Sequence, residues 1–248
     1  MTGAQNWFTE GGADYAQFRP SYGADLAQLL SELAPEQDVA LDVGCGSAQL
    51  SVLLGGRFET VLGIDPSLEQ LQHAAPAAGC HYICASAEQL PLADSCASLV
   101  CAAQAAHWFD LARFYVEVQR VARPGALLAL ISYGVLQLPD GLNERFLQFY
   151  HQEIGRYWPA QRKLVDDGYR SLSLPFAELN APQLSIELEW SLPQLLGYIG
   201  TWSALRQARA CGEKALLERF AEDLARRWGV PQRTQRVRWP LNLRLARL

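Results

Sequence analysis

A glycine-rich turn in the first half of the chain has the residue types needed to hold a nucleoside. The segment LDVGCGSAQL is typical of a buried strand that runs through Gly44 and Gly46 into a helix. Glycine permits a tight turn and a close approach of the backbone to a ligand, and the first N–H groups of the helix can bind it. Asp65, in LGIDPS, lies 19 residues beyond Gly46, where a carboxylate can accept from both hydroxyls of a ribose. The alternative is that Asp65 only caps the next helix, although Ser67 is also placed for that role.

Residues missing from the turn narrow the choice of ligand. A dinucleotide fingerprint needs a third small residue three positions after Gly46, but that position is Gln49. No Lys-Ser or Lys-Thr pair follows the glycines, so the turn is not the phosphate-binding loop of nucleoside triphosphatases. The sequence therefore disfavours NAD as the ligand and excludes the phosphate-binding loop of nucleoside triphosphatases.

The elements around this turn predict a mostly parallel sheet. Short apolar runs alternate with helical patterns between Asp38 and Leu130, which is typical of βαβ units. We expect strands at 39–44, 60–65, 80–85, 97–103 and 126–132, and helices near 26–33, 49–54, 68–75 and 111–122. The last of these helices has Asp110 as its candidate N-cap and Pro124-Gly125 as its candidate stop.

The second half of the chain changes character. Residues 141–171 are helical in pattern and rich in aromatic residues, which predicts an insertion over the sheet. A strand is expected at 185–190, helices at 193–209 and 213–228, and a long strand at 236–248. Apolar residues alternate with polar ones in that long strand, as in an edge or antiparallel strand.

Four segments together resemble successive motifs of the class I S-adenosylmethionine-dependent methyltransferases: LDVGCGSAQL, GIDPS, SAEQLPLAD and RVARPGALLAL. YAQFRPSY, AAQAAHWFDLARFYVEVQRVARPG, TWSAL and VRWPL resemble, more narrowly, small-molecule methyltransferases akin to trans-aconitate methyltransferase. The resemblance implies an α/β, Rossmann-like, doubly wound sheet of seven mostly parallel strands with an antiparallel last strand. It implies one domain over 1–248, made of an N-terminal lid and helix (1–37), a cofactor-binding core (38–133), a helical cap (134–182) and a C-terminal part that completes the sheet (183–248).

The resemblance also implies the cofactor and the residues around it. S-adenosylmethionine would bind as the methyl donor and leave as S-adenosylhomocysteine. By resemblance, the residues around the methionine part are Asp42, Gly44, Cys45 and Gly46, and Asp65 binds the ribose. Those around the adenine are Pro66, Ser86, Ala87 and Glu88, and those that face the sulfonium are Gln104 and Ala105. One departure is Ala48, where the family usually has a third glycine, and a positive φ there would strain the chain and weaken cofactor binding.

Residues near the end of the fourth strand and near the start of the chain are candidates for contacting the acceptor. His107 is the candidate general base, because ligands of such sheets bind at the carboxyl edge; the alternative is that it packs beside Trp108 and orients the loop. Trp108 is either a wall of the cofactor site or a packing residue. By resemblance Tyr15, Arg19 and Tyr22 belong to a lid, where aromatic faces attract a sulfonium and Arg19 pairs with a carboxylate or lies in a surface ion pair.

Composition and charge limit the classes of protein to which the chain can belong. The net charge is −5, but residues 206–248 carry +7 and the rest −12. Because the basic residues are spaced along a helix and a strand, we expect a solvated face and not a nucleic-acid site. No apolar run is long enough to span a membrane, no leader pattern is present, and six scattered cysteines are typical of reduced thiols, so a cytoplasmic protein is expected. The Cys80–Cys84 segment lacks zinc spacing, so no metal is expected.

These observations predict methyl transfer to a small molecule, with a carboxylic acid as the first acceptor by resemblance. The protein is expected to be a monomer or a homodimer. The alternatives are transfer to a nitrogen, oxygen or carbon atom with His107 as base, a cofactor-binding protein without catalysis, and an RNA or protein methyltransferase that uses the basic tail.

Overall fold

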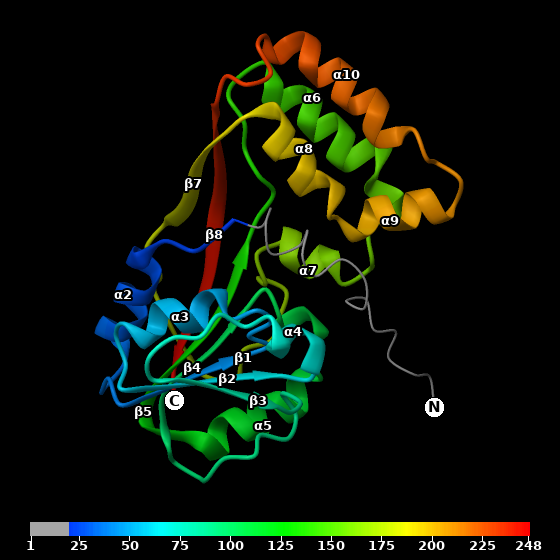
Figure 1. The fold of residues 1–248 in the computed structure, drawn as a ribbon. Helices are drawn as coiled ribbons and strands as arrows, with labels where there is room; N and C mark the ends of the chain where they lie inside the picture. The colour runs from blue at the N-terminus through cyan, green and yellow to red at the C-terminus, as the bar shows by residue number, and fades with distance from the viewer. Residues whose placement is uncertain (1–19) are drawn as a thin grey trace. The chain divides into compact units, whose positions relative to one another are not determined.

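The computed structural model describes residues 20–248, which form two compact units (Figure 1). The sheet unit comprises Ser21–Gly134, Lys163–Ile186 and Pro240–Leu248. Of the described residues, the helical unit comprises Pro20, Val135–Arg162 and Glu187–Trp239. Within the described residues, no helix is both long and apolar enough to cross a membrane.

The sheet has the strand order β3-β2-β1-β4-β5-β8-β6, and β7 also pairs with β8. The first five strands are parallel, whereas β8 runs antiparallel to β5 and to β6. The strand bounds are β1 Val39–Val43, β2 Thr60–Asp65, β3 Cys80–Cys84, β4 Ala97–Ala103, β5 Ala122–Tyr133, β6 Ala177–Leu179, β7 Leu184–Trp190 and β8 Gln235–Arg247. The predicted Rossmann-like sheet with an antiparallel last strand is confirmed.

Strand register brings the ends of the parallel strands to one edge. Val43 of β1 lies beside Ile64 of β2, and Ile64 lies beside Ile83 of β3. Asp42 lies beside Cys101 of β4. The residues that follow these strands, including the glycine-rich turn, therefore gather at the carboxyl edge, where ligands of open α/β sheets bind.

Helices cover both faces of this sheet; Figure 1 shows α5 on the face opposite α3. The helix α5 buries one apolar face, and the Asp110 carboxylate accepts from the Arg113 N–H at 3.3 Å, which confirms the predicted N-cap. The helices of this unit are α2 Ala24–Leu33, α3 Gln49–Gly55, α4 Leu68–Gln72, the 3₁₀ turn η1 Ala106–Trp108, α5 Leu111–Val121 and α7 Arg162–Asp166, whose first residue belongs to the helical unit.

The predicted end of α5 is confirmed to within one residue, but the predicted start of the next strand is wrong. The helix ends at Val121, three residues before Pro124, and β5 starts at Ala122 and not at 126, so Pro124 and Gly125 lie inside the strand. Gly125 has a φ of +79°, and its N–H donates to the carbonyl of Leu248 at 2.7 Å. These two residues therefore follow the end of the helix, as predicted, and also lie in the first part of β5.

The helical unit packs through aromatic rings. Phe149 and Phe220 stack at 4.0 Å between ring centroids, and buried Arg145 pairs with Glu153 and Asp223. An aromatic cluster consists of Phe146, Tyr150, Trp158, Trp190, Tyr198, Trp202 and Trp239. The helices are α6 Leu142–Gln148, the π-helical turn η2 Phe149–Glu153, η3 Gly155–Tyr157, α8 Leu192–Gly200, α9 Ser203–Ala210 and α10 Leu216–Trp228.

The single helix expected at 193–209 is two helices. The helix α8 ends at Gly200, and Trp202 has the extended φ and ψ of an N-cap before α9. Trp202 is 6% exposed and its ring lies against four other rings of the aromatic cluster. Burial of this ring gives a local reason for the break, because an unbroken helix would place Trp202 differently.

Candidate active site

The glycine-rich turn after β1 alternates left-handed residues with right-handed or extended ones. Gly44, Gly46 and Ala48 have φ values of +76°, +54° and +70°. The N–H groups of Gly44 and Cys45 both donate to the carbonyl of Ile64, at 2.7 and 3.1 Å. The strain expected at Ala48 is present, since an alanine in this region costs about 1–2 kcal/mol relative to right-handed backbone. The turn is thus held against the end of β2 by backbone bonds.

Gly44 and Gly46 are glycines for different reasons. A Cβ on Gly44 would lie 2.4 Å from the Cβ of Ala105 and 3.3 Å from the ring of Phe109. A Cβ on Gly46 would meet nothing closer than the Gln70 side-chain oxygen at 3.8 Å. The loop after β4 therefore lies directly against Gly44, whereas Gly46 is limited by its φ alone.

Asp65 ends β2 and faces the same turn. Its Oδ2 accepts from the Gly46 N–H at 2.9 Å and its Oδ1 accepts from the Ser67 N–H at 2.8 Å. Ser67, not Asp65, caps α4 with its side chain. A carboxylate has about four lone-pair sites, so Asp65 retains acceptor capacity for two hydroxyl donors.

The side chains of Asp42, which precedes the turn, and Cys45, which is part of it, are buried. The Asp42 side chain accepts from Ser51 Oγ at 2.6 Å and lies 3.9 Å from Cys101 Sγ. Burial raises the pKa of Asp42 to about 6, against the lowering effect of the Ser51 hydrogen bond. Burial also raises the pKa of the Cys45 thiol well above its usual range. Asp42 thus supports the turn from inside and ties it to α3.

The loop after β3 carries the predicted adenine contacts and is tied to α5 at two places. Ala87 is buried, and Glu88 Oε1 accepts from the Asp110 N–H at 2.9 Å. Ser86 and Pro66 are both exposed. Glu88 therefore connects this loop to the start of α5.

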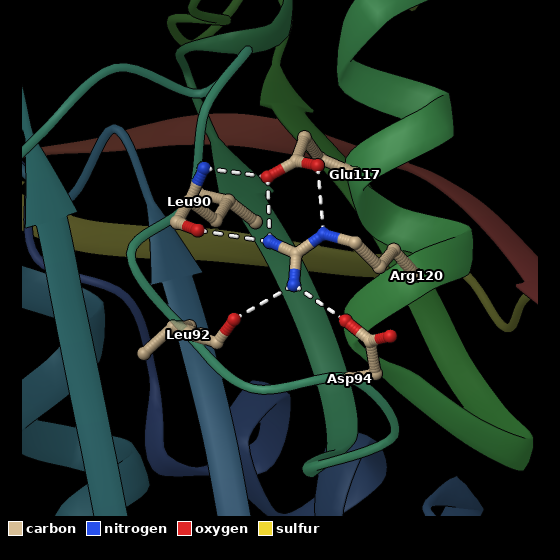
Figure 2. A network of polar contacts seen from close by, with 5 residues as sticks. All are labelled: Leu90, Leu92, Asp94, Glu117 and Arg120. Carbon is tan, nitrogen blue, oxygen red and sulfur yellow. Dashed lines mark hydrogen bonds and ion pairs between the residues drawn. The ribbon is translucent and has the colours of Figure 1, made fainter.

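The second tie is the Arg120 network, defined by Leu90, Leu92, Asp94, Glu117 and Arg120 (Figure 2). The Arg120 guanidinium donates to the carbonyls of Leu90 and Leu92 at 2.9 and 2.7 Å, and to the carboxylates of Asp94 and Glu117. Glu117 Oε2 accepts from the Leu90 N–H at 2.6 Å, and the hydrogen bonds from Arg120 lower the pKa of Glu117. No motif in the sequence identified Arg120 as a residue that shapes this loop.

The loop after β4 holds the predicted sulfonium-facing residues. Gln104 has a φ of +55°, and its N–H donates to the Ile131 carbonyl at 2.8 Å. Its amide Nε2 donates to the Tyr133 carbonyl at 3.3 Å. The Tyr133 ring lies 6.3 Å from the ring of Tyr22, which is the described member of the predicted lid. Tyr15 and Arg19 lie outside the described residues.

His107 of η1 has a hydrogen-bond partner that no sequence motif indicates. Its Nδ1 lies 2.8 Å from the hydroxyl of Tyr169, which is fully buried and has a φ of +63°. The Trp108 ring lies 4.8 Å from the His107 ring and Trp108 is 37% exposed. Only the count of aromatic residues in 141–171 pointed toward Tyr169, because no short spacing links it to His107.

The sequence also raised the questions of a metal site and of the basic tail. Within residues 20–248 there is no group of three His, Cys, Asp or Glu side chains that could hold a metal ion. Several cations of the basic tail pair with carboxylates: Arg219 with Glu213, Arg226 with Asp223, Arg236 and Arg238 with Glu187, and Arg244 with Glu178. These pairs reduce the field that the tail presents to a polyanion.

Similarity to known proteins agrees with this geometry. Residues 41–130 match a family model described as a methyltransferase domain. A protein of Dictyostelium discoideum named as a methyltransferase is 31% identical over 214 residues, 85% of this chain and 81% of that protein. A solved structure from Anaeromyxobacter dehalogenans, described as a type II methyltransferase, is 42% identical with a TM-score of 0.88 and covers 93% of this chain and 98% of its own. The chain belongs to the class I S-adenosylmethionine-dependent methyltransferases.

Similarity to these proteins identifies the family but not the substrate of this chain. A malonyl-[acyl-carrier protein] O-methyltransferase of Methylovorus is 33% identical over 171 residues, 64% of this methyltransferase and 55% of that protein. The narrower resemblance to trans-aconitate methyltransferase stays a prediction. The carboxyl-edge residues are brought together around one turn: Gly44, Cys45, Gly46, Asp65, Gln104 and Ala105.

Proposed function

We propose that this methyltransferase transfers the methyl group of S-adenosylmethionine to a small-molecule acceptor, with a carboxylic acid as the first candidate. The observation that carries the proposal is the Gly44 turn, closed by Ala105 on one side and hydrogen bonded to the Asp65 carboxylate on the other. When bound, S-adenosylmethionine would supply an electrophilic methyl group.

The residues present fit this cofactor. Asp65 is an acceptor beside a turn whose backbone has no side chain at Gly44 or Gly46, which suits a ribose with two hydroxyl donors. Gly44, Cys45 and Gly46 would line the methionine part, with Asp42 beneath them. Pro66, Ser86, Ala87 and Glu88 would border the adenine, and the Arg120 network would hold their loop in place.

The chain's own residues would align the acceptor and exclude water. Gln104 and Ala105 would face the sulfonium, because their loop lies against Gly44. Trp108 and the predicted lid residues Tyr15, Arg19 and Tyr22 would cover it. A carboxylate acceptor has no proton to lose, so alignment and desolvation suffice; a neutral oxygen or nitrogen acceptor would need a base, for which His107 is the candidate.

The similarity to malonyl-[acyl-carrier protein] O-methyltransferases supports a carboxyl acceptor, because those proteins are named for methylation of an acid. The ion pairs of the basic tail favour a small acceptor over RNA. Ala48 is the observation that favours the second candidate, a cofactor-binding protein without turnover, since its strained φ weakens the turn.

The test has two stages. Calorimetric titration of the full chain with S-adenosylmethionine, S-adenosylhomocysteine and NAD should give binding by the first two only. Formation of S-adenosylhomocysteine is then measured with mono- and dicarboxylic acids, each beside its amide. Turnover of acids but not amides supports the proposal. Binding without turnover of any acceptor supports the second candidate, and absence of binding to the folded chain contradicts both.

A further inference from the structure

The hydrogen bond between His107 and Tyr169 involves a buried tyrosine with a strained backbone. Tyr169 is fully buried and lies in the left-handed region, with a φ of +63°. A bulky residue with this φ is an outlier, and it persists only where the surrounding structure enforces it. The strained backbone at Tyr169 therefore fixes the position of its hydroxyl, and the surrounding contacts must hold it there.

The turn that carries Tyr169 is fixed from several directions within the sheet unit. The Tyr169 N–H donates to the Leu164 carbonyl at 2.8 Å, which closes the end of α7. The guanidinium of Arg244, in β8, donates to the Tyr169 carbonyl at 2.5 Å and to the Leu172 carbonyl at 3.2 Å. A Cβ on Gly168 would lie 2.8 Å from Asn242 Cγ, so β8 also packs closely on the preceding residue. This frame sets the hydroxyl 2.8 Å from His107 Nδ1.

The direction of this hydrogen bond decides what His107 can do. In a neutral imidazole one nitrogen carries the proton and the other accepts, and the bond made by one nitrogen sets the state of the other. A phenol is a stronger acid and a weaker base than a neutral imidazole, so the hydroxyl donates to Nδ1. The proton of His107 then resides on Nε2.

We infer that Tyr169 holds His107 as the Nε2–H tautomer, so that His107 is a hydrogen-bond donor to an anionic acceptor oxygen and not the general base. This inference rests on the proposed function and makes it more specific, because a carboxylate needs a donor to orient it and no base to deprotonate it. His107 lies in η1, between Ala105 and Phe109, the two residues of this loop that lie against Gly44. Tyr169 is a positioning residue, since it acts through His107.

The first test is nitrogen NMR of the histidine rings in the ¹⁵N-labelled full chain at neutral pH. The chain has four histidines, and the His107→Gln variant assigns the signals of His107. We expect a pyrrole-like Nε2 and a pyridine-like Nδ1 in the parent protein, and a mixture of tautomers in Tyr169→Phe. The opposite tautomer, or a doubly protonated ring, would overturn the inference.

A matched control is available in the same unit. Tyr115 is also buried, and its hydroxyl has no hydrogen-bond partner in the described part of the chain. The variant Tyr115→Phe removes the same atom from a similar environment and should leave the His107 spectrum unchanged. A change in Tyr115→Phe equal to that in Tyr169→Phe would show a general loosening and count against the inference.

The second test uses an acid found to be methylated. His107→Ala should raise the KM for that acid about tenfold or more, because a charge-assisted hydrogen bond is lost, with kcat changed only a few-fold. His107→Gln should restore most of the KM, since its amide can donate in place of Nε2–H. A kcat that collapses in both variants would identify a base and overturn the inference. If no acid is methylated although the NMR result holds, the proposed acceptor fails and the tautomer assignment stands.

Discussion

The glycine-rich turn and the aromatic cluster of the helical unit are held in place by different physical means. The turn depends on three left-handed residues and on backbone bonds to Ile64 and Asp65, so its geometry is a property of the main chain. The aromatic cluster depends on ring volume; the Trp202 ring, for example, contacts four other rings. We conclude that variants of the turn should alter cofactor binding, whereas variants that disturb ring packing should alter stability.

Phe220→Ala is expected to have the largest effect. It removes a ring that is fully buried and stacked on Phe149, which costs about 4 kcal/mol of unfolding free energy. Urea denaturation measures this loss, and the Kd for S-adenosylmethionine, measured on the folded protein, should stay unchanged. Val230→Ala, at a position 64% exposed in the same unit, is the control. A weakened Kd in Phe220→Ala would break the separation between the two regions.

Gly44→Ala should lower stability too, but unlike Phe220→Ala it should also weaken cofactor binding. The new Cβ would meet the Cβ of Ala105 at 2.4 Å in a left-handed residue, so we expect a loss of about 3 kcal/mol in stability and a large rise in the Kd for S-adenosylmethionine. Gly46→Ala is the matched control, because a Cβ at this position has room. This variant should lose only the stability that a left-handed φ costs an alanine, about 1 kcal/mol. Equal effects at the two positions would contradict the role of Ala105.

Asp42→Asn should raise stability at neutral pH. Burial raises the pKa of Asp42 from 3.8 to about 6. Because ionisation is less favourable in the folded state, the free energy of unfolding falls as the pH rises from about 4 to 6, and the whole loss is present above pH 6. Asparagine cannot ionise and can still accept from Ser51. The variant should therefore be more stable by about 3 kcal/mol at pH 7.5, with little difference below about pH 4.

Denaturation at the two pH values separates this from a general packing effect, which would give the same difference at both. We also expect the Asp42→Asn variant to bind S-adenosylmethionine more weakly, because the turn loses a charge beneath it. A variant that is more stable and binds equally well would show that the buried carboxylate has no role in the site.

Arg120→Met should cost about 2 kcal/mol, since it removes bonds to the Leu90 and Leu92 carbonyls and to two carboxylates. The loop with Ser86, Ala87 and Glu88 should loosen, and the Kd for S-adenosylmethionine should rise a few-fold in calorimetry. The pKa of Glu117 is lowered mainly by Arg120, so this part of the stability is present above the unfolded pKa and lost as the pH falls through the folded one.

The control for the Arg120 network is Arg113→Met on the same helix, where the side chain is exposed. It should leave both stability and the Kd unchanged. If the difference between Arg120→Met and the parent protein does not shrink in acid, the pairing with Glu117 contributes nothing to it.

Ala48→Gly should have the smallest effect. Glycine relieves the left-handed strain at a φ of +70°, and the gain is about 1 kcal/mol after the greater flexibility of the unfolded chain is included. A modestly lower Kd for S-adenosylmethionine is the expected second result. Ala102→Gly, in the buried strand β4, should instead destabilise the protein, which separates relief of strain from a general effect of glycine.

The sequence predicts the sheet and the turn because their determinants are local. The strands β2 and β4 begin and end at the predicted residues, since apolar runs bounded by turn residues mark them directly. The same locality explains why Gly44, Gly46 and Asp65 could be found by spacing. The end of α5 was predicted to within one residue, whereas the start of β5 was placed too late, because a proline and a glycine can lie inside the first part of a strand as well as in a loop before it.

Contacts between distant residues could not be found in this way. Tyr169 reaches His107 across 62 residues, and Arg120 reaches Leu90 across 30. Each depends on how separate elements pack, and no periodicity within one element encodes it. The break at Trp202 belongs to the same class, because burial of its ring involves residues of other helices.

The place of β8 between β5 and β6 also bears on how the chain is made. On a ribosome, β5 is complete at Tyr133, but its antiparallel neighbour begins its pairing at Leu241. At 5–20 residues per second, the β5 edge stays open for roughly 5 to 20 seconds of synthesis. An open, apolar strand edge invites pairing with other chains, so the nascent protein should depend on chaperones during this interval more than the finished one does.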